Sequence, residues 1–198
     1  MTSANDPSGP TTGELYARAL DATRRFIAGI APEQWELPTP CDEWNLRELV
    51  GHVMYGTVWI EDAFVGKTME EVGDKYDGDL IGDDALAAYD AAVASAKRGL
   101  SQPGAMEMYC HLSRGDVLGS DYARSMFTDV FIHGWDIAKA TGQDTGLDAE
   151  LVVALWALTE PRRERMMSSP AFGAGKVPEP PALADLQTRL LAMLGREA

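Results

Sequence analysis

The chain has 198 residues, a length that fits one domain and can bury a sizeable core without disulfide support. It carries 17 basic and 31 acidic residues, a formal net charge of −14, and no basic stripe that would neutralise phosphates, which excludes nucleic acid as a partner. No apolar run approaches the roughly 20 residues that span a bilayer, so we expect no membrane segment. Cys41 and Cys110 are too few for a disulfide framework, and residues 1–10 lack the features of a secretory signal. We therefore expect reduced thiols in a cytoplasmic protein.

Helical spacing of apolar residues predicts six helices. Residues 1–10 are rich in small and polar side chains and are expected to be disordered, whereas residues 11–198 are expected to form a single domain. Capping residues such as Asn45 with Glu48, and the helix breaker Pro32, set the boundaries. The predicted helices cover residues 12–31, 46–66, 85–100, 121–140, 150–165 and 185–194.

The segments between these helices are less regular. Residues 67–82 are rich in Gly and Asp, which predicts a loop. Residues 104–120 fit either a short strand near 106–112 or a loop, and residues 170–181 have the composition of a linker. Because the helices are long and no strand is clear, the fold class is predicted to be all-α, with the helices packed as a bundle.

The predicted helix over 121–140 carries acidic and imidazole side chains on one face. Asp129 and His133 are four residues apart, so their side chains lie one turn apart on the same side of the helix. A carboxylate and an imidazole at this spacing can chelate one metal ion, or they can form a simple salt bridge. Asp136 follows three residues later and is placed to accept a hydrogen bond from the far ring nitrogen of His133.

The helix over 46–66 offers a third donor. His52 lies on the apolar face, beside the small residues Gly51 and Gly56, which are expected to leave room for an ion. Burying charged groups is costly unless they are paired or bind a metal, which is the reason to connect His52 with Asp129 and His133. The alternative is a core histidine whose hydrogen bonds are satisfied within the bundle.

Two motifs and the C-terminal tail resemble the mycothiol-dependent maleylpyruvate isomerase N-terminal family, within the DinB-like superfamily of metal-binding helical bundles. The resemblance covers roughly residues 12–196. The segments that carry it are Thr39-Pro-Cys41-Asp-Glu-Trp44-Asn-Leu-Arg-Glu-Leu-Val-Gly-His52, Asp129-Val-Phe-Ile-His133-Gly-Trp135-Asp136-Ile-Ala and Arg189-Leu-Leu-Ala-Met-Leu-Gly-Arg196.

The resemblance implies a DinB-like up-down four-helix bundle with additional C-terminal helices. It also implies that His52, Asp129 and His133 hold a divalent ion, with zinc favoured and nickel or iron as alternatives, and that Asp136 orients His133. The family's isomerase has Glu at the position of Asp129 and a second, C-terminal domain, so the substrate is left open. Related bundles can pair through their helices, which leaves a homodimer open.

Three functions are consistent with such a site. The first is a transferase or isomerase in which the ion activates mycothiol or another low-molecular-weight thiol for attack on an electrophilic small molecule. The second is a metal-dependent hydrolase, in which the ion activates water and Glu48 or Asp136 serves as base. The third is a non-catalytic bundle that binds a ligand or partner.

Other side chains have a simple structural interpretation beside a functional one. Cys41 precedes a helix start, where its thiol pKa could be lowered, but a packed cysteine is the simpler interpretation. Cys110 and His111 are adjacent on an extended segment and are expected to point to opposite faces. The aromatic residues are expected in the core or at its rim, and Tyr55 and Trp59 can also form a wall of the pocket beyond His52. Arg114 and Arg124 are candidates for contact with an anionic substrate.

Overall fold

The computed structural model describes residues 9–164, 168 and 183–197. The chain forms two compact units, one of residues 10–145 and one that includes residues 146–198. The linker predicted over 170–181, and all but the last two residues of the disordered segment predicted over 1–10, lie outside the described residues. The prediction that residues 11–198 form one domain stays a prediction.

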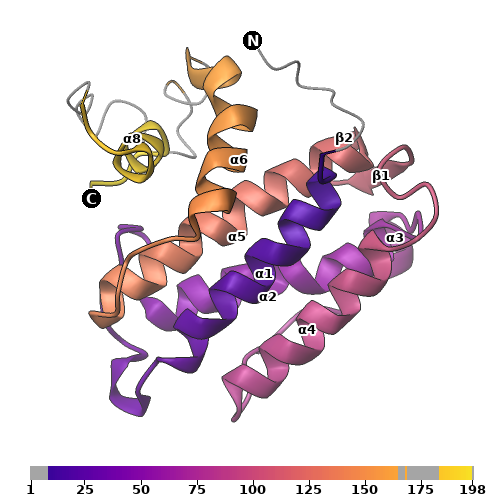
Figure 1. Ribbon diagram of the computed structural model, residues 1–198. Coiled ribbons are helices and arrows are strands. Elements are labelled where there is room, and N and C mark those ends of the chain that lie inside the picture. Colours follow the sequence, from indigo (N-terminus) through magenta and orange to yellow (C-terminus); the bar gives the residue numbers. More distant parts are fainter. Residues whose placement is uncertain (1–8, 165–167, 169–182, 198) are drawn as a thin grey trace. The chain divides into compact units, whose positions relative to one another are not determined.

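Four long helices form the first unit, α1 (Thr12–Ala28), α2 (Leu46–Ala63), α4 (Ala85–Leu100) and α5 (Gly119–Thr141) (Figure 1). Helices α1 and α2 each contact both α4 and α5, so the four helices close into a ring around one core. The all-α bundle with additional C-terminal helices is therefore confirmed. Its largest fully buried side chains include Tyr16, Leu20, Leu46, Leu49, Met54, Ile60, Phe64, Tyr89, Phe127, Phe131, Ile132 and Trp135.

Local capping explains where the helices begin and end. The side chains of Thr11, Asn45 and Asp84 each accept a hydrogen bond from a backbone amide in the first turn of α1, α2 and α4. In α1 and α2 a glutamate three residues later completes a capping box. Helix α5 ends at Gly142, which adopts a left-handed conformation with φ of 71°.

Close contact between α1 and α5 depends on a glycine. A Cβ added at Gly134 would lie 2.7 Å from Thr23 Oγ1, so any larger residue would force the helices apart. The Thr23 hydroxyl uses this proximity to donate a 3.1 Å hydrogen bond to the carbonyl of Val130. The backbone of α5 is thereby fixed next to the residues that carry the candidate chemistry.

The segment 67–82 was expected to be a loop and contains one short helix, α3 (Met69–Val72). The prediction missed it because a helix of four residues has no apolar period, although Thr68 and Glu71 form a capping box. The segment is fastened to α2 through Asp62, a nearly buried carboxylate. Its oxygens accept hydrogen bonds from Lys67 Nζ at 2.8 Å, Lys75 Nζ at 2.6 Å and the Tyr76 hydroxyl at 2.8 Å.

Residues 104–120 contain a β-hairpin, which agrees with the predicted strand and adds its partner. Strand β1 (Tyr109–Leu112) pairs antiparallel with β2 (Gly115–Leu118). Gly115 has φ of 105°, a conformation that other residues rarely adopt, and it completes the tight turn. The hairpin contacts α2 and α5 at the beginning of α5.

The second unit contains α6 (Ala149–Thr159), the 3₁₀ turn η2 (Glu160–Arg162) and α8 (Leu186–Met193). Helix α6 ends earlier than the predicted residue 165, because Pro161 has no amide proton and falls in the 3₁₀ turn. Helices α6 and α8 are in contact, and the Arg189 guanidinium lies 4.6 Å from the centre of the Trp156 ring.

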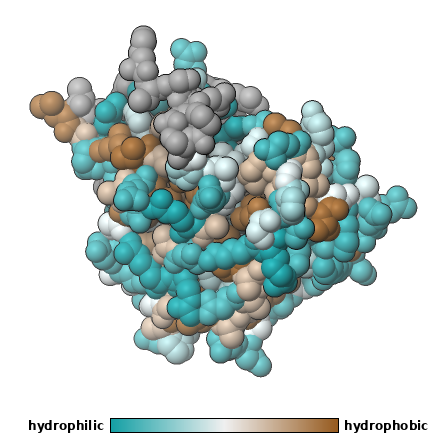
Figure 2. Space-filling view, turned by 45° about the vertical axis from the view of Figure 1, so that its right-hand side comes forward, coloured by the Kyte–Doolittle hydropathy of each residue, from teal (hydrophilic) through white to brown (hydrophobic). Residues whose placement is uncertain are grey.

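The surface agrees with the strongly charged composition. Most of the face in Figure 2 is hydrophilic, with hydrophobic side chains scattered in small groups. Among the residues that the structure describes, no helix combines the length and the apolar character needed to cross a bilayer.

Candidate metal centre

Helix α2 carries His52 on the side that faces α5. Its Nε2 atom lies 3.2 Å from Asp129 Oδ1, and the side chain is about one third exposed. The room expected beside His52 is partly filled: a Cβ added at Gly56 would lie 2.6 Å from Met126 Cε, and one at Gly51 would lie 3.9 Å from Ile81. Gly56 therefore serves close helix packing, whereas Gly51 makes only an ordinary contact.

Helix α5 carries the other predicted side chains. Asp129 is half-buried, His133 is buried and Asp136 is fully buried. His133 Nε2 lies 3.5 Å from Asp129 Oδ1, the same oxygen that contacts His52. His133 Nδ1 lies 2.9 Å from Asp136 Oδ2, which is hydrogen-bond distance. The two ring nitrogens of His133 thus meet different carboxylates.

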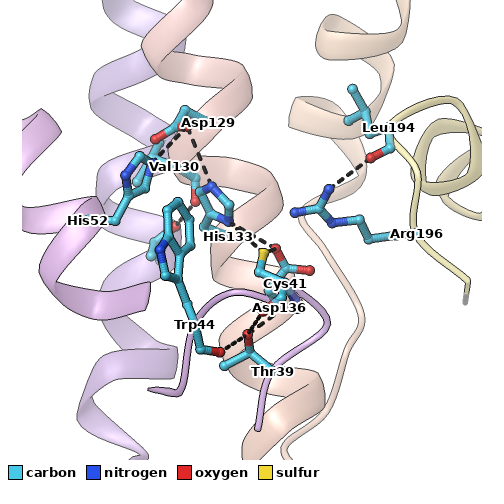
Figure 3. A network of polar contacts seen from close by, with 11 residues as sticks. Thr39, Cys41, Trp44, His52, Asp129, Val130, His133, Asp136, Leu194 and Arg196 are labelled. Atoms are coloured by element: carbon cyan, nitrogen blue, oxygen red, sulfur yellow. Dashed lines mark hydrogen bonds and ion pairs between the residues drawn. The ribbon is translucent and has the colours of Figure 1, made fainter. Parts of the chain in front are cut away.

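The residues that were predicted as metal ligands come together from α2 and α5, and His52 and Asp129 are 77 residues apart in sequence (Figure 3). One donor atom from each of His52, Asp129 and His133 lies within 4.8 Å of the other two. In a tetrahedral zinc site, nitrogen and oxygen ligands at their usual bond lengths are about 3.3 Å apart. The contacts of 3.2 and 3.5 Å are close to this value, so the donor set fits a divalent ion. The assignment of these residues as ligands stays a prediction.

Electrostatic coupling within the group is strong. Burial alone would raise the pKa of Asp129, but hydrogen bonds with His133 and His52 outweigh it and the pKa is lowered. Burial alone would lower the pKa of His133, but hydrogen bonds with Asp129, Asp136 and Cys41 raise it. In the absence of a metal ion, a proton on His133 therefore stabilises the two carboxylates. A cation would take over this role and release the proton.

The loop before α2 brings two further side chains to the site, and the sequence did not predict this. The Trp44 ring stacks on the His52 ring, with centroids 4.5 Å apart, and lies 5.9 Å from the His133 ring. Cys41 Sγ lies 3.4 Å from Asp136 Oδ2 and 3.8 Å from His133 Nδ1. Trp44 thus covers His52, and Cys41 lies on the Asp136 side of His133.

Backbone hydrogen bonds hold this loop in place. It begins after the 3₁₀ turn η1 (Pro32–Gln34) and returns along its own start, where Leu46 donates to the carbonyl of Leu37 and Arg47 to that of Trp35, both at 2.9 Å. The Thr39 hydroxyl donates to the Trp44 carbonyl at 2.8 Å and accepts from the Cys41 amide at 3.1 Å. The only sequence signal was that the Thr39 to Trp44 motif directly precedes the helix of His52.

The remaining candidates lie elsewhere in the described chain. Cys110 is fully buried, which raises its pKa to about 11, whereas His111 is half-buried and pairs with Asp116 across the hairpin at 2.7 Å. Arg124 forms an ion pair with Asp121. Three more candidates keep their roles as predictions: Tyr55, which is 44% exposed; Trp59, which is buried and touches Tyr55 and Tyr76; and Arg114, which is exposed in the hairpin turn.

Together, the fold and the site define a helical bundle with a candidate metal centre between two of its helices. Residues 16–138 match the family described as the mycothiol maleylpyruvate isomerase N-terminal domain. The chain belongs to this family, which is consistent with the DinB-like superfamily.

Two relatives from Mycobacterium tuberculosis are similar to most of the chain. They are the uncharacterized protein Rv0738 of strain ATCC 25618 / H37Rv and the uncharacterized protein MT0763 of strain CDC 1551 / Oshkosh. Each is 34% identical over 166 residues, which cover 81% of this chain and 82% of the relative. No solved structure matches the chain significantly.

Proposed function

We propose that the protein binds a divalent metal ion, with zinc favoured, through His52, Asp129 and His133, and that it transfers or rearranges small molecules with the help of mycothiol or a similar thiol. The observation that carries this proposal is the convergence of three donor atoms from α2 and α5 within 4.8 Å. The family membership of residues 16–138 supports the thiol.

The donor set suits a reactive centre. Three protein ligands leave one position of a tetrahedral ion open. When bound there, the cation would lower the pKa of a coordinated small-molecule thiol and so favour its thiolate form at neutral pH. The anionic Asp129 supplies the charge that retains a cation, and the two imidazoles add no charge of their own.

Neighbouring residues orient the ligands. Asp136 accepts the Nδ1 proton of His133, which leaves Nε2 free to point at Asp129 and His52. Trp44 packs on one face of the His52 ring and thereby restricts its rotation. A cytoplasmic location goes with this proposal, because neither Cys41 nor Cys110 forms a disulfide and small thiols are kept reduced there.

The test uses His52→Ala in a Cys41→Ser background. Without the Cys41 thiol, any zinc bound at this site must be held by nitrogen and oxygen donors. The control is His111→Ala in the same background, because His111 lies outside the donor set and pairs with Asp116. We expect the His52 variant to lose bound zinc in elemental analysis and to lose transfer of mycothiol to a general electrophile such as chlorodinitrobenzene. The control should keep both.

Two outcomes decide against the proposal. Full retention of zinc by the His52 variant would show that His52 is not a ligand. Turnover of an ester or amide substrate that is the same with and without added thiol would instead favour metal-assisted hydrolysis.

A further inference from the structure

A second donor set lies on the opposite side of the His133 ring. It consists of Cys41 Sγ, His133 Nδ1 and Asp136 Oδ2, which all lie within 4.8 Å of one another (Figure 3). The separations are 3.8 Å from sulfur to nitrogen, 3.4 Å from sulfur to oxygen and 2.9 Å from nitrogen to oxygen. Around a tetrahedral zinc ion with usual bond lengths, these three separations would be about 3.3 to 3.6 Å. Small shifts of the side chains therefore suffice for all three to reach one ion.

The protein scaffold places these donors before any ion binds. His133 and Asp136 are one turn apart on the same helix and are both buried. Cys41 is held by the Thr39 hydroxyl, which accepts from its amide and donates to the Trp44 carbonyl. Since Cys41 is partly exposed whereas Asp136 is not, an ion would enter from the side of the thiol.

We propose that Cys41, His133 and Asp136 form a second metal site, selective for thiophilic ions such as zinc, cadmium or cobalt. Binding replaces two protons, one from the Cys41 thiol and one from His133 Nδ1, and both pass to solvent. The sulfur donor separates this site chemically from the first donor set, which has only nitrogen and oxygen atoms. The proposal does not depend on the proposed thiol chemistry.

The two sites are coupled through a single ring. A neutral imidazole has one nitrogen with a lone pair for a metal and one nitrogen that carries a proton. Once an ion has replaced the Nδ1 proton, the remaining ring proton stays on Nε2, the atom that faces Asp129, and Nε2 then has no lone pair for a metal. At neutral pH we expect the two sites to compete, with one ion bound per chain.

The experiment is a cobalt titration, because a thiolate bound to Co²⁺ gives a near-ultraviolet charge-transfer band that imidazole and carboxylate do not. The His52→Ala variant, which removes the first site, should show the band with one equivalent of cobalt. Adding Cys41→Ser to it should abolish the band. Adding Cys110→Ser should leave it unchanged, since Cys110 is buried in the hairpin. Absence of the band in His52→Ala, or its persistence without Cys41, overturns the proposal.

A second measurement needs no cysteine substitution and covers the case in which Cys41→Ser fails to fold. In His52→Ala, saturating zinc should slow alkylation of Cys41 at least 10-fold, as read by mass spectrometry of the peptide that contains it. An unchanged alkylation rate contradicts the second site. Failure of the proposed function would be seen in a different measurement, namely loss of zinc binding and thiol transfer in protein that retains His52. The second site is tested only in His52→Ala.

Discussion

At the scale of single residues, Asp129 is the point at which the two helices of the first donor set meet. One of its oxygens contacts both His52 and His133, at 3.2 and 3.5 Å. The short aspartate side chain keeps this carboxylate close to the backbone of α5. The charge of this group, more than its length, is expected to decide whether a cation stays bound.

Asp129→Glu and Asp129→Asn separate charge from length. In the Cys41→Ser background, we expect Asp129→Glu to retain zinc and Asp129→Asn to bind it about 30-fold more weakly. Loss of a charged partner costs about 2 kcal/mol at the lower end of the range for buried pairs, which suits a half-buried group. Competition titration with a chromogenic chelator measures both affinities. Equal affinity of the asparagine variant and its parent would show that the ligand charge is unimportant.

At the scale of elements, the bundle depends on close approach of α1 to α5 and on the fastening of residues 67–82 to α2. Helical spacing predicted the four long helices well, because each has an apolar face against the shared core. The same reasoning could not find α3, which has too few residues for a period. For residues 104–120 it left a short strand and a loop as alternatives, and it did not predict the second strand of the hairpin. The capping pair of Asn45 and Glu48 predicted the start of α2 correctly, whereas its end lies at Ala63 and not at the predicted Gly66.

Gly134→Ala tests the approach of α1 to α5. Alanine in a helix is favoured over glycine by about 1 kcal/mol, but the new Cβ would lie 2.7 Å from Thr23 Oγ1. Overpacking of this kind costs about 1 to 3 kcal/mol, so we expect a net loss of roughly 1 kcal/mol in urea unfolding. The control is Gly51→Ala, where the new Cβ makes only an ordinary 3.9 Å contact and stability should rise. Stabilisation by both substitutions would contradict the steric argument.

Asp62→Asn tests whether the hydrogen bonds of Asp62 hold residues 67–82 against α2. Burial alone would raise the pKa of Asp62, but hydrogen bonds from Lys67, Lys75 and Tyr76 lower it to about 2. Because the folded pKa lies below the ordinary value, the stabilisation is complete above about pH 4 and is lost as the pH falls through 2.

The wild type should therefore lose roughly 2 kcal/mol more than Asp62→Asn between pH 5 and pH 2, as measured by urea unfolding. The exposed pair of Arg24 with Asp90 provides the control, since solvent screens this pair and Asp90→Asn should leave the pH profile nearly unchanged. Parallel pH profiles for the wild type and Asp62→Asn would rule out this role of Asp62.

At the scale of the whole molecule, the candidate site depends on contacts that the sequence encodes only indirectly. Helical spacing predicted that Asp129 and His133 share a face, but nothing local relates them to His52, and only the family resemblance joined the two helices. The places of Cys41 and Trp44 could not be predicted, because they follow from the path of a loop that folds back on its own start, and no periodic pattern in the sequence encodes that path.

Ion binding should be visible in the stability of the chain. A ligand that binds only the folded state stabilises it by about 2.7 kcal/mol at 100 times its dissociation constant, which for a chain of this size corresponds to roughly 5 to 10 °C in melting temperature. We expect this shift on adding zinc to the Cys41→Ser protein and no shift once His52→Ala is added. An equal shift in both proteins would place the ion elsewhere.

The stacking of Trp44 on His52 also gives the protein an optical reporter of its own. An indole in contact with an imidazole loses excited-state energy to it when the ring is protonated, and far more to an open-shell ion held by that ring. The emission of Trp44, isolated as the difference between the wild type and Trp44→Phe, should therefore differ between zinc and cobalt bound at His52. Trp44, which restricts the rotation of His52, thus also reports which metal ion His52 binds.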